Sequence, residues 1–319
     1  MNLTVEKENI SIFDYSWQII ANPNALSSSC YKQWEEIASK LDELQLDYQF
    51  HITDEAESAH KLVSRLCQQG HRHIMALGGD GTVNSIVNGI FFSGVPTQEI
   101  YLAVLPLGTG NDWCRTHRYP RVPLESINIF LRGQFVKHDI GKVACVKEGK
   151  TVYERYFLNI AGFGFDAAII HQTADKRGRI NNKHIYILTL LKNLFSHKAQ
   201  KVFFRTDEGE CEEMLFSAAV GICRYNGNGM QQLPAANPTD GFFDLMLLAP
   251  ISPFKILKNI KNLYNGNLGH LPEIRFLKSK EVYIKASPYV LGEIEGDALP
   301  TSDYHLTLYP GALHILTAL

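Results

Sequence analysis

The sequence has little of what marks several common classes of protein. Its 319 residues contain 31 Lys+Arg against 33 Asp+Glu, a net charge of −2, which argues against a dedicated nucleic-acid binder. No apolar run approaches the ~18 residues of a membrane-spanning helix. The opening MNLTVEKENISIF contains acids but no apolar core of a signal peptide. These absences predict a globular protein of the cytoplasm.

Several signatures of cofactor sites are missing as well. The six cysteines are scattered without a C-x-x-C pair, so we expect neither a disulfide framework nor a zinc site. The sequence contains no G-x-x-x-x-G-K-[ST], which excludes a P-loop protein. Residues 162–167 fit G-x-G-x-x-[GA], but no ribose-binding acid follows at the expected distance. We therefore interpret that stretch as structural.

What the chain does contain is an ordinary globular composition, 45% hydrophobic and 20% charged, and a length typical of two domains. In the first 135 residues, short apolar runs alternate with segments of helical periodicity. The predicted strands are 17–21, 48–52, 73–77 and 100–105, and the predicted helices contain 34–44 and 59–67. Helical connectors between strands predict a parallel sheet with right-handed crossovers.

Two glycine-rich loops follow the third and fourth predicted strands. Residues 78–82 read GGDGT and residues 106–112 read PLGTGND, and both are expected at the carboxyl edge of the sheet. Glycine lets backbone N–H groups approach an anion, and a helix N-terminus adds positive potential. The two loops suit a polyphosphate, with Asp80 and Asp112 able to hold Mg²⁺ or its waters. We expect Asp80 to have no role in the core. The alternative is two tight turns capped by their own acids.

The second half of the sequence has a different residue pattern. From residue 134, short runs rich in Val, Ile, Tyr and Phe alternate with turns, which predicts a mainly antiparallel β domain. Residues 182–195 form a predicted helix with a broad apolar surface, and residues 171–205 contain eight Lys/Arg against one acid. Such a segment predicts peripheral contact with an anionic membrane, which Lys255, Lys258, Lys261 and Lys278 would extend. The alternative is a domain helix packed on the sheet with solvated lysines.

Several motifs, in order along nearly the whole chain, resemble the catalytic domain shared by diacylglycerol kinases and sphingosine kinases, and most closely the soluble bacterial lipid kinases. They are GGDGTVNSIVNG (78–89), LPLGTGNDW (105–113), Asn159 with GFGFD (162–166), DGFFD (240–244), EGD (295–297) and the closing stretch 306–315. The resemblance implies an α/β N-terminal domain with a parallel sheet, as in NAD kinase and diacylglycerol kinase, and a mainly antiparallel β-sandwich second domain. Residues 1–135 would form the nucleotide-binding domain, completed by about 300–319, and residues 136–299 a β-rich lipid-substrate domain.

The same resemblance implies an ATP-dependent lipid kinase of phospholipid metabolism, which transfers the γ-phosphate to a hydroxyl of a diacylglycerol-like or sphingoid lipid. Asp80 and Asp112 would organise catalytic Mg²⁺, and Asp297 or Glu295 would accept the proton of the lipid hydroxyl. The residues expected to bind ATP are Asn22, Thr53, Gly78, Gly79, Asp80, Gly81, Thr82, Val83, Asn84, Gly108, Thr109, Gly110 and Asn111. A second Mg²⁺ is expected on the side chain of Asp240 and the backbone carbonyls of Asn237 and Phe242.

Departures from the family pattern leave alternatives open. Ser85 stands where the family often has Glu, and Glu295 and Asp297 have interchanged lengths, so either of the two is a candidate base. The rival functions are an NAD kinase-like nucleoside kinase and a non-catalytic lipid or nucleotide binder on the same scaffold. Diacylglycerol, a sphingoid base and ceramide all remain candidate substrates. The oligomeric state also stays open, with a homodimer as one candidate.

Overall fold

A computed structural model describes residues 12–22, 28–53, 58–107, 110–120, 122–174 and 191–318. The chain forms two compact units: residues 1–138 together with 310–319, and residues 139–309. Two long strands, β5 (Gln134–Lys147) and β16 (Asp303–Thr317), carry the chain from one unit into the other. The divisions predicted from the sequence lie at residue 135 and near residue 300.

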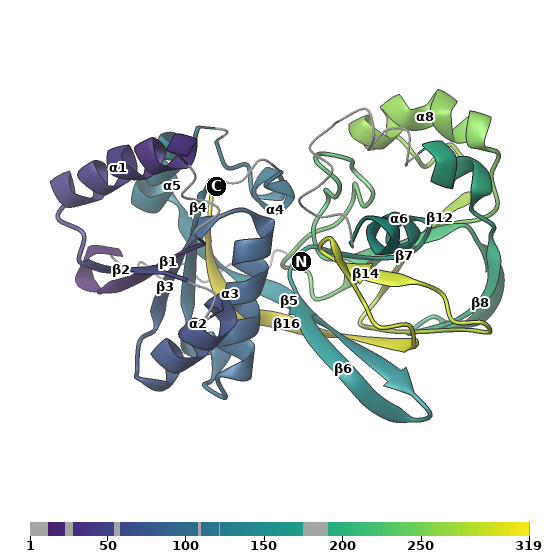
Figure 1. Ribbon diagram of the computed structural model, residues 1–319, viewed down its shortest axis with the longest axis horizontal. Coiled ribbons are helices and arrows are strands. Elements are labelled where there is room, and N and C mark those ends of the chain that lie inside the picture. Colours follow the sequence, from purple (N-terminus) through teal and green to yellow (C-terminus); the bar gives the residue numbers. More distant parts are fainter. Residues whose placement is uncertain are drawn as a thin grey trace, which may run out of the picture. The chain divides into compact units, whose positions relative to one another are not determined.

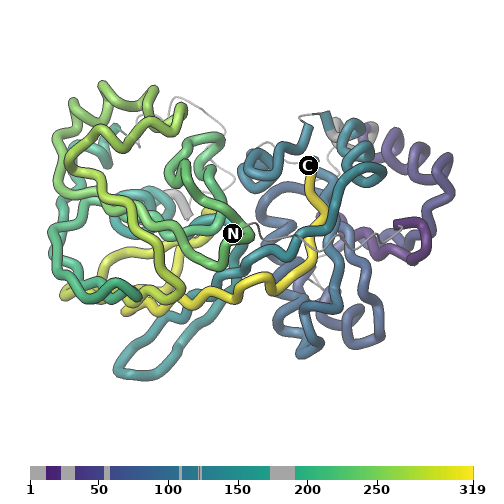
Figure 2. The backbone as a smooth tube through the Cα atoms, turned by 180° about the vertical axis from the view of Figure 1, so that it is seen from behind, coloured from purple at the N-terminus to yellow at the C-terminus, as the bar shows by residue number. Residues whose placement is uncertain are grey.

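The first unit is a parallel sheet with helical connections (Figure 1). Its strands run in the order β2, β1, β3, β4 and β16, and each neighbouring pair is parallel. The first four strands are β1 (Trp17–Ala21), β2 (Tyr48–Ile52), β3 (His73–Gly78) and β4 (Tyr101–Pro106). The runs WQIIA and HIMALG are buried at every position because these strands lie inside the sheet, as expected of continuous apolar runs. Figure 2 shows the yellow C-terminal stretch entering this unit.

The helices of this unit are α1 (Ser28–Glu43), α2 (Ala59–Gln68), α3 (Asp80–Phe92), α4 (Asp112–Thr116) and α5 (Ile127–Arg132), with short 3-10 turns at Ile12–Asp14, Thr97–Glu99 and Pro123–Ser126. Gly89, in the interior of α3, lets this helix pack closely on α2. A Cβ atom at that position would lie 2.6 Å from the carbonyl oxygen of His60. The glycine is therefore required by packing, although glycine weakens a helix by itself.

The second unit is mainly antiparallel. One sheet has the order β12, β11, β10, β7, β14 and β15, and the other runs from β16 through β13 and β8 to β9. The rings of Phe163 in β7 and Tyr304 in β16 lie 5.1 Å apart and join the two sheets. The strands are β6 (Lys150–Phe157), β7 (Ile160–Gly164), β8 (Gln200–Thr206), β9 (Gly209–Leu215), β10 (Ser217–Gly221), β11 (Phe243–Leu248), β12 (Ile274–Ser279), β13 (Glu281–Ala286), β14 (Gly292–Ile294) and β15 (Asp297–Ala298). The α/β unit and the antiparallel unit confirm the predicted fold class.

Two helices complete this unit, α6 (Phe165–Ala174) and α8 (Pro253–Asn265). The helix predicted over 182–195 lies mostly outside the described residues, although residues 191–196 are helical. Among the residues that the structure describes, no helix is both long enough and apolar enough to span a bilayer.

Candidate active site

Residues predicted to bind the nucleotide gather at the carboxyl edge of the parallel sheet. The ladder pairs Ala21 with both Ile52 and Leu77, and it pairs Gly78 with Pro106, so the four strands end together. The residues that follow the strands, in sheet order, are Thr53, Asn22, Gly79 and Leu107. Gly108 and Thr109 lie outside the described residues. The edge is the place where such sheets bind ligands.

The carboxylate of Asp80 joins the two loops. Its Oδ2 accepts the backbone N–H of Asp112 at 2.9 Å and its Oδ1 accepts that of Trp113 at 3.2 Å. The N–H of Leu107 also donates to the carbonyl of Gly78 at 3.1 Å. Burial raises the pKa of Asp80 above its usual value, while the two N–H groups and nearby Arg115 oppose the rise. Asp80 thus holds the backbone of the second loop, a contact that its place in a glycine turn did not indicate.

Asp112 donates its backbone N–H to Asp80, and its own side chain is held by Arg115. Its carboxylate is buried and lies 3.3 Å from Nε of Arg115, which also donates to the carbonyl of Gly110 at 3.3 Å. Asn111 precedes it in the left-handed conformation, with φ of 48°. The carboxylate oxygens of Asp80 and Asp112 are the donor type that Mg²⁺ prefers. Because each of these carboxylates already has a protein partner, they fit an ion that keeps its waters.

In the first turn of α3, the groups available to a ligand beside Gly81 are backbone groups, because the neighbouring side chains are buried. The side chains of Thr82, Val83 and Asn84 are buried, and the amide oxygen of Asn84 accepts from Asn88 at 3.2 Å. A Cβ atom at Gly81 would meet nothing within 4 Å, so there is open space beside this residue. An anion at this helix N-terminus would meet N–H groups and the positive end of the helix dipole.

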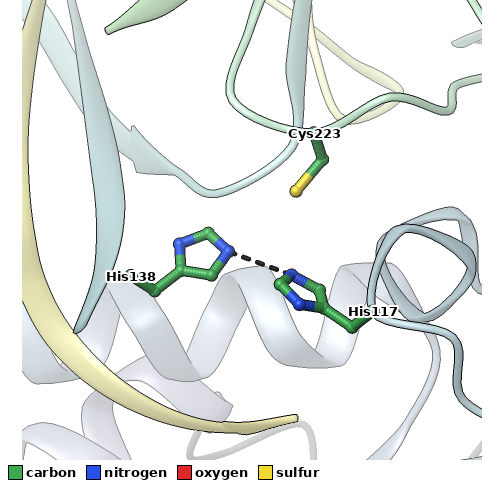
Figure 3. A group of neighbouring side chains, drawn as sticks. All are labelled: His117, His138 and Cys223. Carbon is green, nitrogen blue, oxygen red and sulfur yellow. Dashed lines mark hydrogen bonds between the residues drawn. The ribbon is translucent and has the colours of Figure 1, made fainter. Parts of the chain in front are cut away.

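Two buried histidines, which the sequence analysis did not single out, support α4. The indole N–H of Trp113 donates to Nε2 of His138 at 3.3 Å, and Nε2 of His117 lies 3.2 Å from the same atom (Figure 3). Because an indole can only donate, Nε2 of His138 is an acceptor, and His117 must carry its proton on Nε2. Cys223, also drawn in that view, belongs to the second unit. The pair fixes the residue next to Asp112.

In the second unit, Glu295 and Gly296 form the two-residue turn of the β14–β15 hairpin. Ile294 pairs with Asp297 across the ladder, and the turn residues have φ of 48° and 85°. Such turns favour Asn-Gly, and a glutamate at positive φ is uncommon. Its Oε1 accepts the backbone N–H groups of Leu158 at 2.9 Å and Asn159 at 2.8 Å. These two hydrogen bonds offset the unfavourable backbone conformation and make Glu295 an anchor.

Asp297 has a different environment from Glu295. Its side chain is 43% exposed, and its Oδ2 pairs with Nη1 of Arg155 at 2.9 Å. An exposed carboxylate beside a guanidinium can reach a substrate while its orientation is kept. Of the two candidate bases, Asp297 is the one whose carboxylate is presented to solvent.

Glu293 is a third carboxylate at this turn, and the sequence analysis missed it. It is 2% exposed, and its Oε2 accepts the N–H of Gly296 at 2.8 Å. A Cβ atom at Gly162 would lie 2.5 Å from its Oε1, so the glycine leaves room for it, which explains Gly162 by packing. Burial raises the pKa of Glu293 to about 8, the N–H of Gly296 opposes the rise, and Asp166, Glu295 and Asp297 add to it. A charged residue inside the buried strand GEI was the available signal.

The residues predicted to hold a second Mg²⁺ do not fit that ion in their present arrangement. Oδ1 of Asp240 accepts the N–H of Phe242 at 3.1 Å, and its Oδ2 lies 2.6 Å from Nζ of Lys278. The carbonyl of Asn237 accepts the N–H of Asp240 at 3.4 Å. The ammonium group of Lys278 is thus bound to the carboxylate oxygen of Asp240 that would ligate the metal.

Two family models match consecutive parts of the chain, and curated relatives match most of its length. Residues 16–143 match the family model "Diacylglycerol kinase catalytic domain", and residues 159–317 match "YegS C-terminal NAD kinase beta sandwich-like domain". A "Probable lipid kinase YegS-like" of Chromohalobacter salexigens is 27% identical, over 82% of this chain and 81% of the relative. A "Diacylglycerol kinase" of Staphylococcus saprophyticus is 23% identical, over 88% of each chain.

Solved structures share the fold. A diacylglycerol kinase from Bacillus anthracis superimposes with a TM-score of 0.68 at 20% identity, over 95% of this chain and 97% of the other. The yeast NADH kinase solved with NADH gives a TM-score of 0.54 at 12% identity, over 94% of this chain and 82% of the other. At these identities the likeness concerns the fold.

The raised pKa of Glu293 predicts a pH-dependent stability. Its folded pKa of about 8 lies above the ordinary 4.5, so its favourable contribution is complete below pH 4.5 and is lost as the pH rises through 8. We expect Glu293→Gln to remove a pH-dependent loss of folding stability that is on the order of 5 kcal/mol. Thermal unfolding midpoints from pH 5 to pH 9 would show a flatter profile for this variant. Glu208→Gln, in an exposed turn, serves as the control, and equal slopes in all three proteins would contradict the assignment.

Proposed function

Because the chain belongs to the diacylglycerol kinase catalytic-domain family, we propose that it is an ATP-dependent lipid kinase, which phosphorylates a hydroxyl of a diacylglycerol-like or sphingoid lipid. The observation that carries the proposal is the carboxylate of Asp80, which fastens both glycine loops at the edge of the sheet. The family and the fold support a kinase. The lipid substrate is the proposed part.

The first unit would bind the triphosphate. The N-terminus of α3 and the open space beside Gly81 suit the phosphate oxygens, because backbone N–H groups and the helix dipole meet an anion there. Thr53, after β2, and Asn22, after β1, lie at the same edge, and we propose that they supply hydroxyl and amide contacts. Phosphoryl transfer depends mainly on positioning and on neutralising charge. Mg²⁺, when bound with ATP, supplies that neutralisation, and Asp80 and Asp112 would hold it through its waters.

The second unit would supply the base. Asp297 is the better candidate, because its carboxylate is exposed and oriented by Arg155. Glu295 uses one oxygen for two backbone N–H groups, so its position is tied to the backbone of residues 158 and 159, whereas the carboxylate of Asp297 is bound by a side chain. The hydroxyl oxygen of the lipid would bond to the γ-phosphorus while its proton passes to Oδ of Asp297, and the bond from the γ-phosphorus to the β,γ-bridging oxygen would break to release ADP.

A nucleoside kinase is the second candidate, because the fold is shared with yeast NADH kinase. A direct test measures ADP formation by the purified protein with ATP, Mg²⁺ and either diacylglycerol, a sphingoid base, ceramide or NAD. We expect ADP and a phosphorylated product with one of the lipids and not with NAD. Production of NADP would assign the nucleoside kinase. Nucleotide binding without turnover on any acceptor would assign a non-catalytic binder.

The roles of the two acids predict unequal effects of mutation. Asp297→Asn should lower kcat by ~10²–10⁴-fold while the KM for ATP and the melting temperature stay near normal. Glu295→Gln should be milder, because an amide oxygen can still accept from Leu158 and Asn159. Steady-state kinetics with the lipid identified above would measure both. If Glu295→Gln has the lower kcat, the roles are reversed, and full activity in both variants would exclude this turn from the chemistry.

A lipid substrate requires a surface that meets the bilayer, and α8 offers one. Its residues Phe254, Lys258, Lys261 and Tyr264 are exposed and recur at helical spacing, so they share one face. Phe254 is 73% exposed and packs edge-on against Phe195, with ring centroids 5.5 Å apart. The helix carries three lysines and no acid. Exposed aromatics beside lysines favour an anionic membrane surface in the cytoplasm.

This docking face, defined as Phe195, Phe254, Lys258 and Lys261, can be tested with vesicles. The double variant Lys258→Glu/Lys261→Glu should weaken binding to phosphatidylglycerol vesicles by at least about tenfold, because each lysine near such a surface contributes about 1 kcal/mol. Cosedimentation would measure the binding. Lys147→Glu/Lys150→Glu, on the exposed β5–β6 turn, makes the same charge change elsewhere and should bind as the wild type does. Equal loss in both double variants would show a charge effect without a defined face.

A further inference from the structure

The loop that carries the DGFFD motif is fastened by side chains from other strands. The buried carboxylate of Asp139, in β5, accepts the N–H of Gly241 at 2.8 Å, and its own N–H donates to the carbonyl of Pro238 at 2.8 Å. The Asp240 side chain closes a local turn onto the N–H of Phe242. The loop therefore has a defined shape in which Asp240 faces β12.

Lys278 of β12 bridges the two acids of the motif. Its Nζ lies 2.6 Å from Oδ2 of Asp240 and 3.0 Å from Oδ2 of Asp244. The antiparallel ladder pairs Asp244 directly with Lys278, so strand register brings this ammonium to the site. The side chain of Asp244 is only 9% exposed. A buried carboxylate in such a position needs a cationic partner close by.

Asp244 has a second cation in its environment besides Lys278. Arg224 exerts its positive charge on Asp244 and donates from Nε to the carbonyl of Ala236 at 3.0 Å. Asp244 therefore interacts with two positive side chains, and Asp240 with Lys278. A divalent ion on Oδ2 of Asp240 would have to displace the ammonium group of Lys278. Asp244 would then lose the same ammonium group, which lies 3.0 Å from its Oδ2.

We infer that Lys278 is a built-in structural cation, which takes the place that the family resemblance assigns to a second Mg²⁺. The lysine donates to both acids of the motif and holds β12 against the 237–244 loop, which a metal would otherwise do through oxygen ligands and water. The second unit of this chain should therefore keep its stability without a divalent ion. This role of Lys278 in the folded protein does not depend on which hydroxyl compound is the substrate.

Thermal unfolding in EDTA and in millimolar Mg²⁺, without nucleotide, tests this inference. The wild-type midpoint should be the same in both. Lys278→Met should unfold about 5 °C lower in EDTA and recover in Mg²⁺, because Asp240 then loses its cationic partner, Asp244 keeps only Arg224, and an ion can take the place of the ammonium. Lys201→Met, which removes an exposed pair with Glu212, is the control and should show neither effect. A wild-type midpoint that rises in Mg²⁺, or a Lys278→Met midpoint equal to wild type in EDTA, would overturn the inference.

A direct binding measurement keeps the inference testable if Lys278→Met does not fold. Mn²⁺ binding to the wild type and to Asp240→Asn, followed by electron paramagnetic resonance without nucleotide, should give the same number of bound ions. One additional ion on the wild type would place a metal at Asp240 and contradict the role of Lys278.

Discussion

The hydrogen bonds from the carboxylate of Asp80 to two backbone N–H groups are the contact on which the candidate phosphate site depends. Helix α4 has five residues, too few to be stable by itself, and its N-terminal N–H groups need an acceptor. Asp80 supplies that acceptor from the first turn of α3, where the helix dipole partly offsets the cost of burying a carboxylate. Because the same contact fixes the backbone of Asp112, the spacing of the two glycine loops follows from it. Asp80 sets the distance between the two loops because its carboxylate is hydrogen-bonded to the backbone of the second loop.

In the second unit, a carboxylate likewise accepts two backbone N–H groups, at the β14–β15 turn. Glu295 adopts a backbone conformation that disfavours its side chain, and the N–H groups of Leu158 and Asn159 hold it there. In both units a carboxylate binds two consecutive backbone N–H groups of a distant segment. The resulting geometry is stiff, which suits a reaction whose rate depends on the positions of groups rather than on covalent help from the protein.

Local patterns in the sequence predicted the fold better than the contacts of the site. The apolar runs of β1 and β3 and the loops that follow β3 and β4 are contiguous, so their role can be interpreted from the residues themselves. The contacts that were missed join residues far apart in the chain. Glu293 fits beside Gly162 only once β14 pairs with β7, and Lys278 meets Asp244 only through the register of β11 and β12. Strand register across long separations is set by the whole sheet, which no short motif encodes. The structural role of Asp80 was overlooked for the same reason.

Exposure separates the acids that hold the backbone in place from the acid that we propose as the base. Asp112, Asp244 and Glu293 have side chains that are mostly buried, and each has a hydrogen bond or an ion pair that fixes it. A buried carboxylate with a fixed partner holds the backbone, and a change in its protonation disturbs the fold. Asp297, at 43% exposure, can exchange a proton with little effect on packing. General-base chemistry needs a group that can change charge in every cycle without unfolding its surroundings. With the base role proposed for Asp297, the interchange of Asp and Glu in the EGD motif is tolerable, because the longer side chain reaches the backbone N–H groups and the shorter one remains at the surface.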